Sequence, residues 1–431
     1  MARKRVNVIS LGCSKNLVDS ERLMRMLTDV GYETLHDSDE PAEIVVINTC
    51  GFIGDAKEES INTILEAAQM KDGGEIEQLY VMGCLSQRYR EELPPEIPQV
   101  DCWFGKTDWP GLVKLLAEKS PATAPYDRVI TTPSHHAYLK IAEGCNRFCS
   151  FCAIPLITGR YKSRPIEEIL EETKMLVGRG VKEFNVIAQD LSNYGADLYG
   201  HQAIAELIDS MADIEGVEWI RLHYGYPSDF PMDLLDVMAR RDNVCKYLDI
   251  ALQHIDDTVL ANMRRHINGQ QTRELLAEIR RRVPGIHIRT TLMTGFPGET
   301  EEAFERLMEF TAEQRFERMG AFAYCEEEDT YGARNFEDSI PEEVKQQRLD
   351  RLMALQEKIS GEIQQAKVGQ TMRVIVDREE ADYYVGRTQF DSPEVDPEVL
   401  IQKTRKLKRG EFVEVEITEA LPFELMGKVK E

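Results

Sequence analysis

Short apolar segments alternate with longer stretches of helical periodicity through most of this 431-residue chain. Apolar runs bounded by glycine or polar residues are typical of buried strands, while apolar side chains that recur every three or four positions indicate helices. Strands that alternate with helices form parallel sheets, because each helix carries the chain back to the start of the next strand. In the first part of the chain we predict strands over Val6–Ile9, Ile44–Asn48 and Gln78–Met82, and helices over Ser20–Val30 and Ala56–Gln69.

A second region repeats this alternation after a proline-containing stretch over residues 120–134, which is predicted to be a linker. Six strand-and-helix repeats favour an incomplete, three-quarter version of the TIM-like barrel, whose active site lies at the carboxyl ends of the strands. Helices are predicted over segments such as Pro165–Val177 and Thr300–Gln314. The predicted strands are Tyr138–Ala142, Phe184–Ala188, Trp219–His223, Tyr247–Ala251, His287–Met293 and Gly320–Tyr324.

The pattern changes again near residue 366. Short segments of alternating polarity, separated by turn residues, occur at Met372–Val376, Tyr383–Arg387 and Phe412–Ile417 and predict a small antiparallel β-barrel. We therefore expect an α/β protein of three domains, with boundaries at 1–132, 133–365 and 366–431.

The charge balance restricts the partners of the chain. With 52 Lys and Arg against 76 Asp and Glu, the formal net charge is −24. A chain this acidic is a poor general binder of nucleic acid and is better suited to binding a basic protein. The alternative explanation is that the acidic residues only maintain solubility. No apolar run is long enough to cross a bilayer. The start resembles a lipoprotein signal, but its apolar run, Val6–Leu11, is too short and contains Asn7, so a cytoplasmic protein is expected.

Three of the nine cysteines form a compact motif just after a predicted strand. Cys145, Cys149 and Cys152 have the spacing C-x3-C-x2-C. Three thiolates can hold three irons of a 4Fe-4S cluster and leave the fourth iron open, whereas a ferredoxin would supply a fourth cysteine close by. An open iron indicates a catalytic cluster. The alternative is a zinc site completed by His135 or His136, which the spacing and the aromatic Phe151 disfavour.

Three further cysteines, Cys13, Cys50 and Cys84, are distant in the chain but share one position. Each comes directly after a predicted strand of the first domain. Because the carboxyl ends of parallel strands meet at one edge of a sheet, we expect these thiols to converge, and a second cluster is the preferred interpretation over chance placement. The remaining cysteines are assigned to packing: Cys102, Cys245 and Cys325.

The three-cysteine loop resembles that of radical S-adenosylmethionine enzymes, and the whole chain resembles a methylthiotransferase. Its local motifs are similar to the RimO branch, whereas the tRNA-modifying MiaB branch usually has Gly-Cys-Gln-Met-Asn at the first cysteine. The motifs that carry this resemblance are SLGCSKNLVDSE at 10–21, NTCGFI at 48–53, AKEES at 56–60, GRT at 386–388 and DSPEVD at 391–396.

The resemblance implies a function and a set of cofactors. RimO enzymes add a methylthio group to the β-carbon of one aspartate in the small-subunit ribosomal protein S-twelve. It implies two 4Fe-4S clusters, S-adenosylmethionine, a low-potential electron donor and a sulfur donor, with the chemistry carried by the clusters and no catalytic side chain assigned. The cluster on Cys145, Cys149 and Cys152 would cleave S-adenosylmethionine, and the cluster on Cys13, Cys50 and Cys84 would hold the sulfur to be transferred.

The resemblance also implies a terminal domain of the TRAM type, which binds RNA in related tRNA enzymes. Residues 365–431 hold 11 Lys and Arg against 14 Asp and Glu, which suits a basic protein substrate better than nucleic acid. Modification of a tRNA adenosine, as in the MiaB type, is the alternative function, and a cluster-bearing electron carrier is the non-enzymatic one. A monomer is expected because each domain is large enough for its own core.

Six residues at the predicted strand ends, together with Phe151 of the cysteine loop, are candidate contacts for S-adenosylmethionine. They fit the active rim of a barrel, and glycine permits close approach of the backbone to a ligand. The alternative for each is a structural turn or cap. Arg264 and Arg265 could bind a carboxylate, but surface pairing is the preferred interpretation. The candidate contacts are Phe151, Gln189, Asp190, Gln253, Met293, Gly295 and Glu299.

Overall fold

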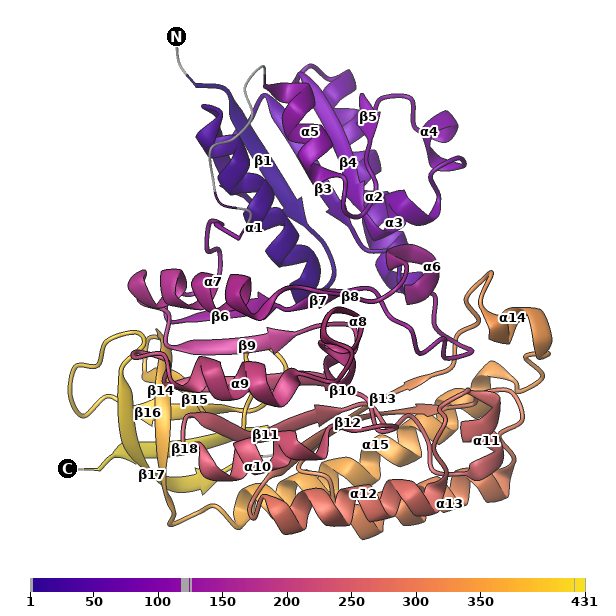
Figure 1. Ribbon diagram of the computed structural model, residues 1–431, viewed down its shortest axis with the longest axis vertical. Helices are drawn as coiled ribbons and strands as arrows, with labels where there is room; N and C mark the ends of the chain where they lie inside the picture. Colours follow the sequence, from indigo (N-terminus) through magenta and orange to yellow (C-terminus); the bar gives the residue numbers. More distant parts are fainter. Residues whose placement is uncertain (1–2, 118–123, 125, 422, 431) are drawn as a thin grey trace.

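The computed structural model describes residues 3–117, 124, 126–421 and 423–430, and it contains three domains (Figure 1). The first domain is a five-stranded parallel sheet of order β2-β1-β3-β4-β5. Apolar side chains alternate between its two faces, and helices cover both. The strands are β1 (Arg5–Ser10), β2 (Glu33–His36), β3 (Ile44–Thr49), β4 (Gln78–Gly83) and β5 (Cys102–Trp103).

The three predicted strands of this domain are present, and the short edge strands β2 and β5 are additional. The first helix begins at Ser14, earlier than predicted, because its first turn is polar and shows no apolar periodicity. That turn is held by Asn16, whose side-chain amide donates to the carbonyls of Leu11 and Thr49 at 3.0 Å each. The helices are α1 (Ser14–Asp29), α2 (Gly54–Asp72), α3 (Cys84–Arg88), α4 (Leu93–Glu96) and α5 (Trp109–Leu116).

The central domain is a six-stranded parallel sheet of order β13-β12-β11-β10-β9-β6, which confirms the incomplete barrel. Its edges, β6 and β13, stay open, and a large apolar core fills the space between sheet and outer helices. A short hairpin of β7 (Ala142–Glu143) and β8 (Lys162–Ser163) flanks the cysteine loop. The strands are β6 (His136–Lys140), β9 (Glu183–Ile187), β10 (Trp219–Gly225), β11 (Val244–Ile250), β12 (His287–Thr294) and β13 (Arg318–Ala323).

Helices alternate with these strands along the chain. Asn268 caps α12 with a reciprocal capping box, and Thr300 caps α13. The helical segments are α6 (Ile154–Thr158), α7 (Ile166–Gly178), η1 (Leu191–Asn193), α8 (Ala196–Tyr199), α9 (Ile204–Ala212), α10 (Met232–Arg240), α11 (Asp257–Asn262), α12 (Gly269–Arg282), α13 (Glu301–Gln314), α14 (Tyr331–Asn335) and α15 (Glu342–Gln365).

The C-terminal domain is a closed five-stranded barrel of order β14-β15-β16-β18-β17. Its pairs are antiparallel except β16 with β18, which are parallel. The barrel packs against the amino ends of the central strands, where Arg387 pairs with Glu183 at 2.7 Å. It therefore lies at the opposite end of the central sheet from the cysteine loop (Figure 1). The strands are β14 (Thr371–Glu379), β15 (Tyr383–Thr388), β16 (Glu398–Gln402), β17 (Phe412–Ala420) and β18 (Glu424–Val429).

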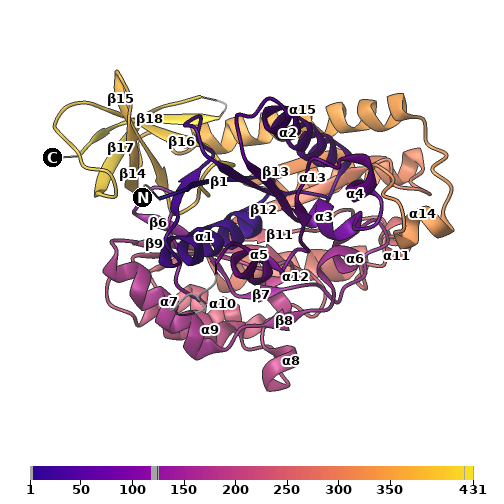
Figure 2. The same ribbon diagram turned by 90° about the horizontal axis from the view of Figure 1, so that it is seen from above.

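The predicted linker, 120–134, is described only in part, since residues 118–123 and 125 lie outside the described residues. The described part of this segment is packed against both domains. Arg128 is 1% exposed, and its Nε donates to Glu172 of α7 at 2.8 Å while Nη1 pairs with Glu21 of α1. The first domain is thereby fixed to the central one, with α1 against β6 (Figures 1 and 2). Among the residues that the structure describes, no helix has the length and apolar character needed to span a membrane.

Candidate active site

The first-domain cysteines meet at the carboxyl edge of their sheet, as their positions in the sequence predict. Cys13 follows β1 as the N-cap of α1, Cys50 directly follows β3, and Cys84 follows β4 as the first residue of α3. The loops are in close contact, because a Cβ placed on Gly12 would come within 2.8 Å of the Cys50 Sγ. Gly12 has a φ of +86°, which also favours glycine.

Buried charges surround this triad. Lys106 is 3% exposed, and its Nζ lies 2.8 Å from Asn16 Oδ1 and 2.5 Å from Asp19 Oδ2. Desolvation opposes ionisation of Cys13, but the ammonium groups of Lys15 and Lys106 lower the pKa of its thiol below the usual value. Burial instead raises the pKa of Cys84 to about 12. This thiol would ionise only on binding a metal.

The second triad lies in the loop between β7 and α6. Gly144 opens the loop with a φ of +86°, and a Cβ there would lie 2.2 Å from the carbonyl oxygen of Arg160. Ser150 closes it, since its backbone N–H donates to Met263 O at 3.0 Å and its carbonyl accepts from Gly332 N–H at 2.6 Å. The cysteine loop is thus fixed by backbone contacts on both sides.

Donors from the loop itself and from neighbouring segments contact its sulfurs. Arg265 Nη1 donates to Cys149 Sγ at 3.2 Å, and the hydroxyl of Tyr226 lies 3.4 Å from the same sulfur. The backbone N–H of Arg147 donates to Cys145 Sγ at 3.5 Å. Hydrogen bonds of this kind stabilise cluster thiolates. Burial raises the pKa of Cys145 to about 11, so this thiol too would need a metal in order to ionise.

The two triads adjoin across the domain boundary. Cys84 belongs to the first triad, yet it packs with Ala153 and Ile157 in one buried cluster. Ala153 directly follows Cys152 of the second triad, and α3 contacts α6. Figure 1 shows α3 and α6 side by side between the two domains. A group bound at one triad would therefore lie close to a group bound at the other.

The donor sets fit iron–sulfur clusters better than single metal ions. Within the described ranges, no three His, Cys, Asp or Glu side chains are gathered tightly enough to hold one ion. In a cluster each thiolate binds a different iron, so wider separation is required. The zinc alternative lacks its histidine, because His135 and His136 lie at the amino end of β6, away from the cysteine loop, and His135 Nε2 is 2.7 Å from Asp377 Oδ1.

The predicted cofactor contacts divide into two groups. Gln189 and Gln253 each carry a buried amide oxygen without a partner among the described residues, which leaves these oxygens available to a ligand. Asp190 and Glu299 are already engaged: Asp190 Oδ2 binds Arg147 Nε at 2.6 Å, and Glu299 Oε1 lies 2.9 Å from Arg348 Nη1. The other three, Phe151, Met293 and Gly295, lie in or beside one aromatic cluster around Phe296.

Sequence reasoning missed the residues that support the cysteines. Arg265 was expected to pair at the surface, but it is 2% exposed and faces Cys149, so that expectation is wrong. Tyr226 follows β10 and could have been included by the same strand-end rule that selected Gln189. Lys106 lies in a loop with no motif of its own, and nothing in the sequence marks it. Arg264 stacks on Tyr331, with its guanidinium 4.6 Å from the ring centroid.

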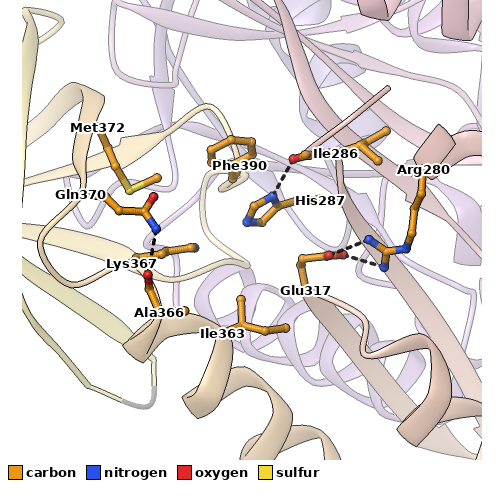
Figure 3. A pocket seen from close by; sticks show the side chains of 11 residues that line it. Arg280, Ile286, His287, Glu317, Ile363, Ala366, Lys367, Gln370, Met372 and Phe390 are labelled. Atoms are coloured by element: carbon orange, nitrogen blue, oxygen red, sulfur yellow. Dashed lines mark hydrogen bonds and ion pairs between the residues drawn. The ribbon is translucent and has the colours of Figure 1, made fainter. Parts of the chain in front are cut away.

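A cavity of about 510 Å³ lies elsewhere, between the central domain and the C-terminal barrel (Figure 3). His287 and Phe390 stack within it, with ring centroids 3.9 Å apart, and Arg280 pairs with Glu317 at 2.7 Å. None of the cysteines lines it. This cavity is therefore distinct from the cysteine site.

Family models match three segments of the chain in order. They are the uncharacterized protein family UPF0004 over residues 5–105, the radical SAM superfamily over 139–311 and the TRAM domain over 368–429. Among solved structures, the radical S-adenosylmethionine methyltransferase TsrM from Kitasatospora setae aligns with a TM-score of 0.56 at 14% identity, over 88% of this chain and 79% of that one. This similarity shows the fold alone.

Curated relatives match over the full length. "Ribosomal protein uS12 methylthiotransferase RimO" of Phocaeicola vulgatus is 60% identical over 431 residues, which cover 100% of both chains. The protein of the same name from Bacteroides thetaiotaomicron is 60% identical over 100% of this chain and 99% of its own. That from Christiangramia forsetii is 50% identical over 99% and 95%. The chain therefore belongs to the RimO family of radical S-adenosylmethionine methylthiotransferases.

Proposed function

We propose that this protein adds a methylthio group to the β-carbon of an aspartate in ribosomal protein uS12, the small-subunit protein S-twelve. The observation that carries the proposal is the 60% identity, over all of both chains, with a curated relative that is named as a methylthiotransferase of ribosomal protein uS12. The two adjoining cysteine triads support it, because the reaction needs a radical step and a sulfur source side by side.

We assign Cys145, Cys149 and Cys152 to the 4Fe-4S cluster that binds S-adenosylmethionine, and Cys13, Cys50 and Cys84 to a second 4Fe-4S cluster. When bound, the first cluster with S-adenosylmethionine supplies radical removal of hydrogen from an unactivated carbon, and the second supplies the sulfur. The protein contributes position and shelter from water.

The side chains around the triads have supporting roles in this proposal. Arg265 and Tyr226 hold Cys149 through hydrogen bonds to its sulfur. Lys106 offsets the negative charge of the first triad. Phe151, Gln189, Asp190, Gln253, Met293, Gly295 and Glu299 are the proposed contacts and supports for S-adenosylmethionine.

The remaining assignments follow from this function. We propose domain boundaries at 1–132, 133–365 and 366–431, and a monomer that works in the cytoplasm, where its ribosomal substrate would be. A low-potential electron donor and a sulfur donor are required partners. Modification of a tRNA adenosine is not favoured, because the chain carries a net charge of −24, which opposes binding to a polyanion.

The test is an anaerobic reaction of cluster-reconstituted protein with S-adenosylmethionine, reductant and sulfide. Purified uS12 and bulk tRNA are offered in parallel and analysed by mass spectrometry. One methylthio mass gain on an aspartate peptide of uS12, absent with Cys145→Ala, is the expected result. A mass gain on a tRNA nucleoside, with uS12 unchanged, would refute the proposed substrate.

A further inference from the structure

Lys15, a cationic residue beside the first triad, forms no ion pair with a carboxylate among the described residues. Lys15 is 8% exposed, and its ammonium lies 3.2 Å from the centroid of the Tyr224 ring. In the described part of the chain, its Nζ makes neither an ion pair within 4.0 Å nor a hydrogen bond. An aromatic ring is a weaker partner for an ammonium than a carboxylate is, so this charge can still bind an anion.

The position of Lys15 connects it with both triads. It lies in the first turn of α1, two residues after Cys13. Its aromatic partner, Tyr224, lies at the carboxyl end of β10, two residues before the Tyr226 whose hydroxyl is 3.4 Å from Cys149 Sγ. Lys15 thus adjoins a cysteine of the first triad in sequence, and its aromatic partner adjoins a tyrosine that contacts the second triad.

Three neighbouring basic side chains are paired with carboxylates. Lys106 lies 2.5 Å from Asp19, and Arg147 lies 2.6 Å from Asp190. Arg289 shares Asp249 and Asp396 at 3.7 and 3.5 Å. The carboxylate of Asp249 also accepts from the Tyr224 backbone N–H at 3.2 Å, so it is occupied. Arg265 donates to Cys149 Sγ and to the backbone carbonyl of Ala251, whereas Lys15 contacts an aromatic ring and can therefore bind an anion brought by the substrate.

The backbone of Tyr224 has an unusual conformation. Tyr224 has a φ of +64° and is 37% exposed, although it adjoins a buried strand. A tyrosine seldom adopts positive φ, and the surrounding contacts must hold it there. In this conformation the ring lies against the Lys15 ammonium.

We propose that Lys15 binds the side-chain carboxylate of the aspartate that is modified, and so selects aspartate over its amide; this inference rests on the proposed function. The carbon that reacts is bonded directly to the carboxyl carbon, so a cation at the carboxylate also positions that carbon between the triads. A chain of net charge −24 would otherwise repel a carboxylate. An asparagine in its place would leave the ammonium unpaired, which is a strong basis for discrimination.

The experiment compares full-length uS12 with a variant in which the modified aspartate is asparagine. Binding of each to the reconstituted protein is measured by fluorescence anisotropy for wild type, Lys15→Met, Lys15→Gln and Lys15→Arg. Methionine and glutamine approximate the length of the lysine side chain without its charge, and arginine keeps the charge. The matched control is Lys114→Met, which removes the same charge from an exposed position on α5 of the same domain. Thermal unfolding checks that each variant is folded.

Wild type and Lys114→Met should prefer the aspartate form by about tenfold, the scale of a charged hydrogen bond. Lys15→Met and Lys15→Gln should bind both forms alike, and Lys15→Arg should restore most of the preference. A folded charge-free variant that keeps the wild-type preference would overturn the inference, as would a wild type that modifies uS12 but binds both forms equally. A wild type that binds and modifies no uS12 overturns the proposed function itself.

Discussion

At the scale of single residues, Gly144 determines whether the second cysteine loop can form. Replacing it with Ala would add a Cβ 2.2 Å from the Arg160 carbonyl at a φ of +86°, and positive φ alone costs about 1–2 kcal/mol. We expect Gly144→Ala to retain about half of the wild-type iron after reconstitution, because the first triad is untouched. The matched control is Gly200→Ala, which has φ +78° but open space around it and should retain most of its iron. Equal iron contents in both variants would contradict this role.

Individual site residues differ in whether the sequence alone predicts them. Cys13, Cys50 and Cys84 were found because a strand end is visible as the close of an apolar run, whereas Cys145, Cys149 and Cys152 were found from their spacing. Lys15, Tyr226 and Arg265 were not assigned to the site, since each comes from a different segment and its direction depends on packing. Arg265 illustrates the reason: its sequence neighbours are polar, yet the folded chain buries it against Cys149.

At the scale of elements, the loop after β13 joins the two cysteine regions. Glu327 Oε2 lies 2.9 Å from Lys57 Nζ of α2 and 2.8 Å from Arg88 Nη1 of α3. Arg88 also donates to the carbonyl of Gly51, the residue after Cys50, at 3.1 Å. Glu327→Gln would leave two poorly exposed cations without a carboxylate, and we expect a destabilisation of about 3 kcal/mol. Hydrogen exchange should accelerate around Cys50 and in α3.

The control for Glu327→Gln is Glu343→Gln on α15, which changes an exposed glutamate for which the structure gives no ion pair. It should change the free energy of unfolding by less than about 0.5 kcal/mol. Unchanged exchange around Cys50 in Glu327→Gln would show that the loop is not needed to hold the first triad. The strands and helices themselves were largely predictable, but this contact was not, because an acidic run such as 326–329 is usually solvated surface.

At the scale of the whole molecule, the order of the domains followed from changes in sequence periodicity, whereas their docking did not. The first domain is attached through buried charges that look in the sequence like ordinary surface residues. Glu172 of α7 is fully buried and is surrounded by Arg128 from the linker, Arg22 from α1 and Arg164. Long-range ion pairs have no periodicity, so a single sequence gives no signal for them. The same pairs make domain docking sensitive to acid.

Burial opposes ionisation of Glu172, but its three arginines lower the pKa of the carboxyl to about 2. An unfolded glutamate titrates near 4.3, so the folded state binds fewer protons in this range. The stabilisation is therefore complete above about pH 5 and is lost as the pH falls toward 2; it amounts to on the order of 3 kcal/mol. We expect Glu172→Gln to be less stable than wild type at pH 7, and its free energy of unfolding in urea to fall less steeply between about pH 5 and pH 3. Parallel pH profiles for the two proteins would mean that another group controls the acid response. The difference between the profiles, and not the absolute stability at either pH, isolates the contribution of this carboxylate to holding the first domain in place.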